Sequence, residues 1–539
     1  MVNVMQEHNP IIGKNLIEML MFSMYPDAKV FYREYVQNAY DAIVDATRKG
    51  ILTAVKDGNI SINIDSSNHT ISVQDNGTGV SVNDVPRVLL NIADSHKDGV
   101  ETAGQYGVGR LVGARYCKRL IFKTSAQGEN KFSEVVFDTV LARKIIHDPN
   151  DHSTAVDVIN RITTINVGDE DAEKHYFEVM MEGVDTAYKD LLNSAAIKEY
   201  MQDVAPIDYE LVFKNILYKN NLPPDFDQLN NLIKNVRVSI NDDTDIRRRY
   251  GLKIEGTGDD IDSLKFFKIN DDDFGTLGWG WFAVTKMTKE IPSSDRNRGL
   301  RLRKQNIQIG DAKVLDKYFK QARGNHYFYG EIHATHENLR PDSARDGLAP
   351  TPDAIAFYDQ IKECFSDLDA LYQAANKIKN INRDIQAVTT LPTGEQTNEE
   401  KASAQNEVEK KLKELTKYEE KAKRDNNSAL AKIVEIHKKE IEKIVDKNHI
   451  SSYLQNNNDN TSFTVSPNRQ NETEKQSKAN ISNKTGNAVD QFEPLKSMYT
   501  TDQLQLIRRV CAAFSQNSKP EERPIIEQIK KKVIKALGK

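Results

Sequence analysis

A carboxylate, an amide and a second carboxylate recur at helical spacing near the start of the chain. Glu34, Asn38 and Asp41 stand at positions i, i+4 and i+7, so they share one face if residues 31–42 form a helix. Such a stripe of polar side chains can face an aqueous cleft. A solvated helix surface carries the same pattern, so this segment alone leaves both interpretations open.

Two glycine-rich segments follow. Residues 75–79 read Asp-Asn-Gly-Thr-Gly, in which Gly77 and Gly79 allow the backbone to approach a ligand closely and Asp75 can accept a hydrogen bond from an exocyclic amine. Residues 104–109 read Gly-Gln-Tyr-Gly-Val-Gly, and glycine-rich backbone that enters a helix can present amide groups to phosphates. Taken singly, each segment is also explained by an ordinary turn or by glycine packing.

The periodicity around these segments predicts an α/β domain over residues 1–164. Helical spacing marks residues 15–25 and 28–47. Strand-like runs follow at residues 59–64, 70–74, 118–124, 132–137 and 154–162. Helices and strands interleaved in this way are typical of an α/β fold.

A second α/β domain is predicted over residues 165–350, mainly helical up to residue 230. Its strand signals lie at residues 236–240, 279–285, 300–309 and 327–332. We expect residues 351–450 to be helical, with a helix over 352–378 and two further apolar seams after a capping-box pattern at 397–400. These seams fit an antiparallel hairpin or an intermolecular coiled coil. Residues 451–490 are predicted to be a disordered polar linker, and residues 491–539 a small helical module.

Composition excludes several classes of protein. Of 539 residues, 38% are hydrophobic and 28% charged, and the net charge of -5 provides no overall positive field for nucleic acid. Cys117, Cys364 and Cys511 are far apart and form no CxxC pair, which excludes a disulfide framework and argues against structural zinc. No apolar run is long enough to span a membrane, and the N-terminus does not resemble a signal peptide. We expect a soluble cytoplasmic protein with no membrane contact.

Together, the polar helix and the two glycine segments closely resemble the nucleotide-binding domain shared by gyrase B, the ninety-kilodalton heat-shock chaperone, sensor histidine kinases and MutL, the GHKL or Bergerat family. Residues 31–42 and 103–110 look most like the chaperone, and the resemblance covers about residues 10–160. It implies a Bergerat-fold α/β sandwich that binds ATP and Mg²⁺. No Walker-type GxxxxGK[ST] sequence is present, which disfavours a P-loop enzyme.

The resemblance also implies roles for single residues. Glu34 would be the general base for the attacking water, Asn38 would coordinate Mg²⁺, and Asp75 would bind the adenine amine. The other implied nucleotide-binding positions are Asp41 on the same helix, Gly77 and Gly79 near the base, and Gly104, Gly107, Val108 and Gly109 around the phosphates.

Two further assignments depart from the family pattern. Residues 81–103 would form an ATP lid containing Ser95 and Lys97, but the chaperone tends to have Ser-Gly-Thr where this chain has Ser-His-Lys. Lys97 can reach phosphates, or it can be a solvated lysine on a loop. Thr154 stands where the family has a threonine near the adenine-binding aspartate, although Ser153 replaces the usual neighbouring glycine.

Hydrolysis of this type needs a cation from outside the first domain, and two segments offer one. Residues 339–346 resemble the chaperone's middle-domain catalytic loop, in which Arg345 matches the arginine that meets the γ-phosphate. Residues 298–306 resemble a MutL- and MORC-like transducer strand that ends in Lys304, although its alternating arginines also fit an exposed strand face. Arg345 is the first choice, because a guanidinium fork suits phosphate better than an ammonium does.

The function implied is a Mg²⁺-dependent ATPase of the chaperone type. ATP would close the lid, two copies would associate at least transiently as a homodimer, and the clamp would act on a protein client or partner. The alternative is an ATP-gated DNA clamp like MutL or MORC, with basic residues at 247–249, 298–304 and 530–532 on phosphates. A sensor kinase is disfavoured because only His8 precedes the Glu34 helix, and a scaffold without hydrolysis is disfavoured by the presence of Glu34.

Overall fold

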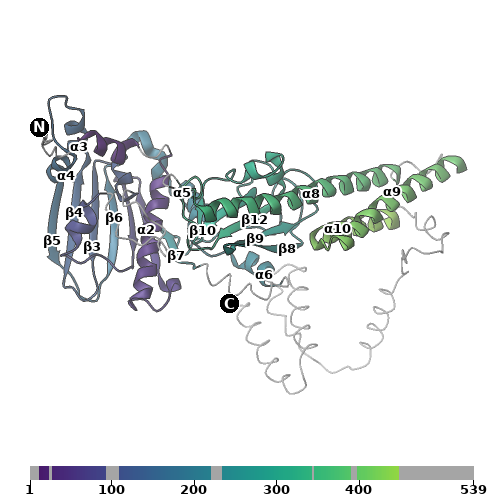
Figure 1. Ribbon diagram of the computed structural model, residues 1–539, viewed down its shortest axis with the longest axis horizontal. Coiled ribbons are helices and arrows are strands. Elements are labelled where there is room, and N and C mark those ends of the chain that lie inside the picture. Colours follow the sequence, from purple (N-terminus) through teal and green to yellow (C-terminus); the bar gives the residue numbers. More distant parts are fainter. Residues whose placement is uncertain are drawn as a thin grey trace, which may run out of the picture. The chain divides into compact units, whose positions relative to one another are not determined.

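The computed structural model describes residues 11–23, 27–92, 109–219, 234–342, 345–389 and 397–447. All of them belong to one compact unit, residues 1–454. The fold is a mixed α/β architecture with two separate sheets, followed by long helices (Figure 1). No helix in the described residues is both long and apolar enough to cross a membrane.

The first sheet has seven strands in the order β5-β4-β3-β6-β2-β1-β7. Every neighbouring pair is antiparallel except β1 with β7, which is parallel. The strands are β1 Asn59–Asp65, β2 Thr70–Asp75, β3 Arg119–Ser125, β4 Lys131–Asp138, β5 Thr163–Asp169, β6 Tyr176–Glu182 and β7 Arg237–Ile240.

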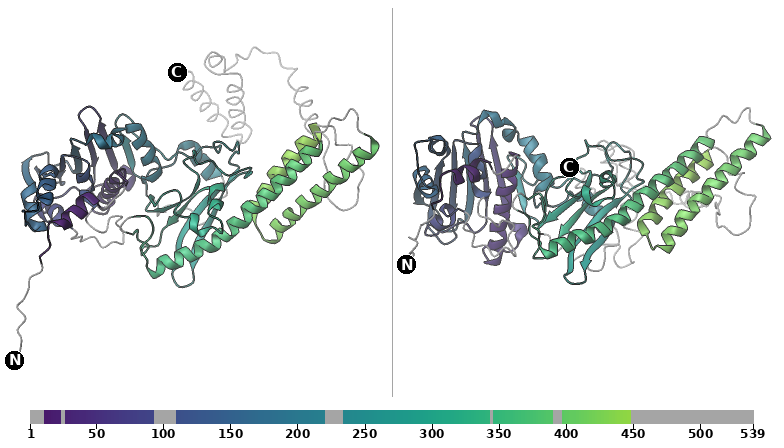
Figure 2. Two further views of the ribbon diagram at one scale, coloured as in Figure 1. Left: turned by 90° about the horizontal axis from the view of Figure 1, so that it is seen from above. Right: turned by 45° about the horizontal axis from the view of Figure 1, so that its top comes forward.

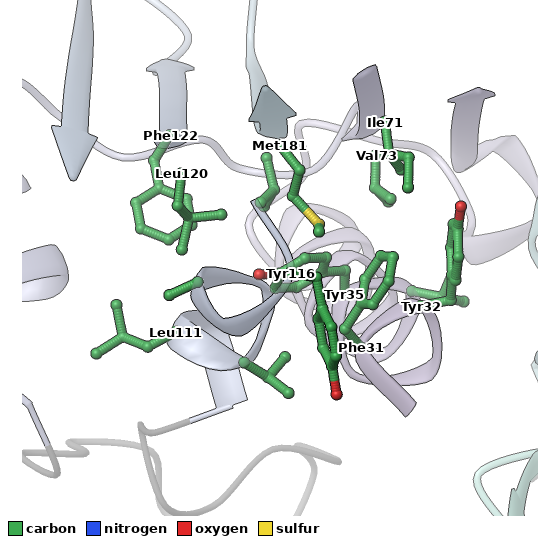
Figure 3. Close-up of a cluster of buried hydrophobic side chains, with 14 of the residues drawn as sticks. Phe31, Tyr32, Tyr35, Ile71, Val73, Leu111, Tyr116, Leu120, Phe122 and Met181 are labelled. Atoms are coloured by element: carbon green, nitrogen blue, oxygen red, sulfur yellow. The ribbon is translucent and has the colours of Figure 1, made fainter. Parts of the chain in front are cut away.

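Helix α2, Val30–Arg48, packs against this sheet. Phe31, Tyr32 and Tyr35 project from α2 towards Ile71 and Val73 of β2, and the apolar cluster around them is drawn in Figure 3. These five side chains are at most 3% exposed. Burying this much apolar surface holds α2, and therefore Glu34, in a fixed place relative to the sheet.

Shorter helices and turns accompany the first sheet. They are α1 Asn15–Glu18 with the π-helical turn η1 Met19–Ser23, the turns η2 Val55–Asp57, η3 Pro86–Leu90 and η4 Gly109–Arg115, α3 Thr139–His147, α4 Ala155–Ile162, η5 Thr186–Leu192 and α5 Ser194–Val204. The helices predicted over residues 15–25 and 28–47 are therefore present as α1–η1 and α2, within the described residues.

The first sheet continues beyond the predicted boundary at residue 164, and below we call the part of the chain around this sheet the first domain and the part around the second sheet the second domain. Residues 165–182, expected to be mainly helical, form most of β5 and all of β6, which pair with β4, β3 and β2. β7 also returns to this sheet from residue 237. The run at 154–162, read as a strand, is α4, because Ala155, Val158, Ile159 and Ile162 bury one helical face.

The second sheet has five strands in the order β11-β10-β12-β9-β8. They are β8 Ser263–Asp271, β9 Gly275–Val284, β10 Gly299–Lys304, β11 Ile307–Ile309 and β12 Tyr329–Ala334, with α6 Leu211–Lys219 and the turns η6 Asp316–Tyr318 and η7 Ala322–Tyr327 alongside. The strand signals at 279–285, 300–309 and 327–332 are thus confirmed, whereas β8 was not predicted.

Three long helices follow the second sheet: α8 Pro352–Thr389, α9 Asn398–Arg424 and α10 Ser428–Lys447. α9 and α10 pack on each other and on α8, as both views of Figure 2 show. The predicted seams are buried at Val408, Leu415, Leu430, Val434 and Ile441. The structure therefore favours the hairpin interpretation over an intermolecular coiled coil. The predicted linker and terminal module lie outside the described residues.

Candidate ATP site

The polar face of α2 is buried rather than solvated. Glu34 is 6% exposed and Asp41 is 3% exposed, while Asn38 between them is half-buried. Burying carboxylates is costly unless they meet partners, so a merely solvated helix face does not account for this arrangement. Aromatic residues of the core lie on the same helix, next to this stripe.

Arg345 reaches Glu34 from the second half of the chain. Its Nε lies 3.0 Å from Oε1 of Glu34, and both side chains are less than a tenth exposed. Arg33, which precedes Glu34 on α2, places its own Nε 3.8 Å from the same oxygen. Glu34 therefore faces two guanidinium groups, of which sequence reasoning identified only Arg345.

Gly109, the last glycine of the second segment, lies against Glu34. A Cβ atom on Gly109 would stand 2.9 Å from Oε2 of Glu34, closer than side-chain carbons normally approach. The structure thus brings the polar helix and the end of the glycine segment together. Ser95, Lys97, Gly104, Gly107 and Val108 lie outside the described residues, as do residues 93–103 of the predicted lid, whereas residues 81–92 are described.

Asp75 ends strand β2 and is 5% exposed. The backbone N–H of Gly77 donates to its Oδ1 at 2.7 Å. Burial raises the pKa of Asp75 to about 8, although this hydrogen bond opposes the shift. A buried carboxyl group with one oxygen held by the backbone presents its other oxygen as a fixed polar group for a ligand.

The turn after Asp75 accepts only glycine at two positions. A Cβ atom at Gly77 would lie 2.6 Å from Cβ of Ala42 on α2. At Gly79, where φ is +62°, it would lie 1.9 Å from the carbonyl oxygen of Ser125. The turn therefore fits between α2 and the end of β3 with no room for a side chain at either glycine.

Thr154 is not brought to Asp75. It caps α4, where its hydroxyl donates to the Asp157 carboxylate at 2.7 Å. Its backbone forms an isolated β-bridge with Gly13. The strands beside Asp75 are β1, with Ile60 opposite, and β6, with Phe177 opposite. His175, just before β6, makes a 2.7 Å hydrogen bond from Nδ1 to the carbonyl of Gly77. His175 was missed because strand pairing, not local pattern, brings it there.

Lys304 and the neighbouring Arg301 and Arg303 are largely buried and hydrogen-bonded within the protein. Nζ of Lys304 donates to the carbonyl of His336 at 2.6 Å. Burial, together with the nearby Arg340, lowers the pKa of Lys304 to about 8. Arg301 and Arg303 are 7% and 1% exposed, so the expectation of an exposed strand face is wrong. Arg345 rather than Lys304 meets the α2 site.

These residues fit a nucleotide whose metal ion takes a single ligand from the protein. The described residues contain no group of three or more His, Cys, Asp or Glu side chains arranged to hold a metal ion. Mg²⁺ keeps waters and takes phosphate oxygens readily, so an amide such as Asn38 can serve as a single protein ligand. The glycine cradle, the buried Asp75 and the Arg345–Glu34 pair are compatible with a bound nucleoside triphosphate.

Comparison with known proteins agrees with this geometry. Residues 29–164 match the family model described as histidine kinase-, DNA gyrase B-, and HSP90-like ATPase. The chaperone protein HtpG of Helicobacter hepaticus is 28% identical over 134 residues, covering 22% of this chain and 22% of that protein. HtpG of Streptomyces coelicolor is 30% identical over 139 residues, with 22% of each chain covered.

HtpG of Clostridium acetobutylicum is 32% identical over 112 residues, covering 18% of this chain and 18% of that protein. The similarity thus spans 22% or less of the length of these three relatives. The family model's match, residues 29–164, contains α2, the Asp75 turn and Gly109. Over residues 29–164 the chain therefore matches the GHKL ATPase superfamily, with motifs like those of the ninety-kilodalton heat-shock chaperone.

Proposed function

We propose that this chain is a Mg²⁺-dependent ATPase in which the first domain binds ATP and the second domain supplies a catalytic cation. The observation that carries the proposal is the 3.0 Å contact between Arg345 and Glu34, because it joins the two domains at one carboxylate. Phosphoryl transfer to water requires chiefly positioning and charge neutralisation. Glu34 would orient the attacking water, and Arg345 would neutralise charge that develops on the γ-phosphate.

The remaining residues of the site have matching roles in this proposal. Asp75 and the Gly77–Gly79 turn would receive the adenine, and Asn38 would hold Mg²⁺. Bound Mg²⁺ would neutralise phosphate charge. Asp41 supports the same polar face of α2, where its 3% exposure makes it a positioning group.

The ATPase would work as a clamp of the chaperone type. ATP binding would close the lid and bring two copies together, and the clamp would act on a protein client or partner. The similarity to HtpG proteins supports this part of the proposal at the level of the first domain. Sedimentation of the Glu34→Ala protein with and without ATP would test the association.

The deciding experiment is steady-state ATP hydrolysis by the parent protein and by Glu34→Ala, Arg345→Ala and Lys304→Ala. We expect the first two to lose about 100-fold or more in kcat while ADP affinity changes little, because both groups act on the reacting phosphate rather than on the base. Lys304→Ala serves as the competing-cation control and should retain turnover in whatever fraction stays folded. Normal hydrolysis by Glu34→Ala would overturn the proposal.

A further inference from the structure

A fully buried carboxylate in the second domain has two arginine partners. Glu331 on β12 is 0% exposed and accepts hydrogen bonds from Nε of Arg303 at 2.8 Å and from Nη1 of Arg248 at 3.3 Å. The hydroxyl groups of Tyr209 and Tyr250 also donate to it. Burial would raise the pKa of Glu331, but the two arginines outweigh it and hold that pKa well below its usual range.

We call Glu331, Arg248, Arg303 and Asn306 the Glu331 cluster. Asn306 belongs to it because its Oδ1 accepts from Nη1 of Arg248 at 3.0 Å and its carbonyl accepts from Nη1 of Arg303 at 3.2 Å. Buried ion pairs contribute little net stability compared with apolar packing, so a cluster of this kind calls for another reason. A role in fixing one geometry is such a reason.

The cluster binds residues 203–207, which run from the end of α5 towards α6 and which we call the connector. Its donors reach alternate carbonyls at the end of α5 and just beyond it: Arg303 Nη2 to Asp203 at 2.8 Å, Arg248 Nη2 to Ala205 at 3.0 Å and Asn306 Nδ2 to Ile207 at 3.2 Å. Helix α5 in turn packs against α2, the helix that carries Glu34. The cluster therefore ties the second sheet to the helix beside the candidate ATP site.

The cluster also leads to Arg345 by a second route. Asn306 occupies the turn between β10 and β11 with φ at +63°. Ile307, the next residue, is 3% exposed and packs into the core of the first domain. Gly310 directly follows β11, and its backbone N–H donates to the carbonyl of Arg345 at 2.7 Å. A displacement of the Asn306 turn would thus move the backbone of Arg345.

We propose that the Glu331 cluster, acting through Asn306, is a positioning device that sets the place where Arg345 meets Glu34. The inference rests on the proposed ATPase function. Its physical basis is that a displacement of about 1 Å at a reacting centre is enough to cost 100-fold in rate. Both routes from the cluster end at the two partners of this one ion pair.

The test compares Asn306→Gly with the parent protein. Glycine accepts the positive φ and removes only the side-chain amide. We expect kcat to fall about 10-fold or more while the ADP dissociation constant changes less than about 2-fold, because the base and phosphate sites of the first domain stay intact. In an Arg345→Ala background, Asn306→Gly should cause no further fall, since a positioning residue has no effect without the group it positions.

Asn325→Gly is the matched control. Asn325 is also fully buried in the second domain, where it binds the N–H of Leu300 at 2.7 Å and Asp316, but it has no contact with the connector carbonyls. It should lower Tm and leave kcat near the parent value. Tyr250→Phe, which removes one 3.1 Å hydrogen bond to Glu331, offers a milder probe with a smaller fall in kcat if Asn306→Gly does not fold.

The outcomes separate the two proposals. If Glu34→Ala and Arg345→Ala lose hydrolysis but the folded cluster variants keep the parent kcat, the positioning role is wrong and the ATPase assignment stands. Additive losses in the Arg345→Ala background would likewise reduce the cluster to a purely structural role. If Glu34→Ala and Arg345→Ala turn over normally, both proposals fall.

Discussion

The buried carboxyl groups of Glu34 and Asp75 in the first domain have different surroundings. Glu34 faces the guanidinium groups of Arg345 and Arg33. Asp75 has a backbone N–H on one oxygen, and burial raises its pKa to about 8. Enzymes separate the tasks of similar acids in this way, by giving each a different environment. The proposed division is that Glu34 serves the reacting phosphate and Asp75 serves the base.

The raised pKa of Asp75 predicts a pH-dependent cost in stability. The folded state holds the Asp75 proton up to about pH 8, whereas the unfolded chain releases it near its ordinary value of 3.8. Stability from this group is therefore full below about pH 4 and declines as pH rises towards 8, by up to about 1.4 kcal/mol per unit. Asp75→Asn should remove the decline, so its gain in the free energy of unfolding should grow with pH.

Urea unfolding of the parent and Asp75→Asn proteins at pH 5, 6.5 and 8 would measure this gain. Asp65→Asn is the control, because the hydrogen bonds from Asn68 lower the pKa of this exposed carboxyl group. Its effect on stability should stay constant over the same range. A difference between parent and Asp75→Asn that does not change with pH would contradict the buried, proton-retaining state.

At the scale of elements, α2 buries a polar face, whereas the long helices α9 and α10 bury apolar faces. The α2 pattern left open whether its polar face was solvated, and the structure buries that face against Arg345 and Gly109. In α9 and α10 the apolar seams are buried against α8 of the same chain. The buried polar side chains of α2 thus line the candidate site, whereas the buried apolar side chains of α9 and α10 hold the three long helices together.

The hairpin predicts a local loss of stability on truncation of its core. Ile433 on α10 is 0% exposed, so Ile433→Ala should destabilise the packing of α8 and α10 by about 2–4 kcal/mol. Ile355→Ala on α8 is the matched control, because Ile355 is 58% exposed and should change stability by less than about 0.5 kcal/mol. Hydrogen exchange of the α8 and α10 amides would measure both effects.

The same measurement distinguishes a hairpin from an association of chains. Packing within one chain makes the Ile433→Ala effect independent of protein concentration, whereas an intermolecular coiled coil makes it larger on dilution. A concentration-dependent effect would return the helices to the coiled-coil interpretation.

At the scale of the whole molecule, most of the basic groups considered for DNA contact are engaged within the protein. Arg248, Arg301 and Arg303 are at most 7% exposed. Arg247 pairs with Asp245 at 2.6 Å, and Arg249 lies 3.8 Å from Glu210. Burial therefore keeps Arg248, Arg301 and Arg303 from a phosphate backbone, and the net charge of the whole chain is -5.

We therefore expect duplex DNA neither to bind at low salt nor to stimulate ATP hydrolysis. Binding assays across a salt series, combined with ATPase measurements, would test this. A variant in which Lys530, Lys531 and Lys532 are alanine controls for the basic residues outside the described part of the chain. DNA binding that requires ATP and survives in this variant would revive the DNA-clamp alternative.

The sequence by itself determined the local parts of the site. Glu34, Asn38 and Asp41 lie on one helix because their spacing is helical, and Gly77 and Gly79 mark a turn that no side chain can enter. Such features depend on neighbours within a few residues, and periodicity reports them. The same reasoning located α8 and the hairpin seams.

Only the tertiary structure decided which distant residues meet at the site. Thr154 matched a family position by order along the chain, yet strand pairing places β6 and His175 beside Asp75 instead. The alternating arginines of β10 looked solvent-facing until Glu331 on the adjacent strand was seen to bind Arg303. Register and burial are set by long-range pairing, which local periodicity does not encode. For the same reason, sequence nominated both Arg345 and Lys304, and only the fold brought Arg345 to Glu34.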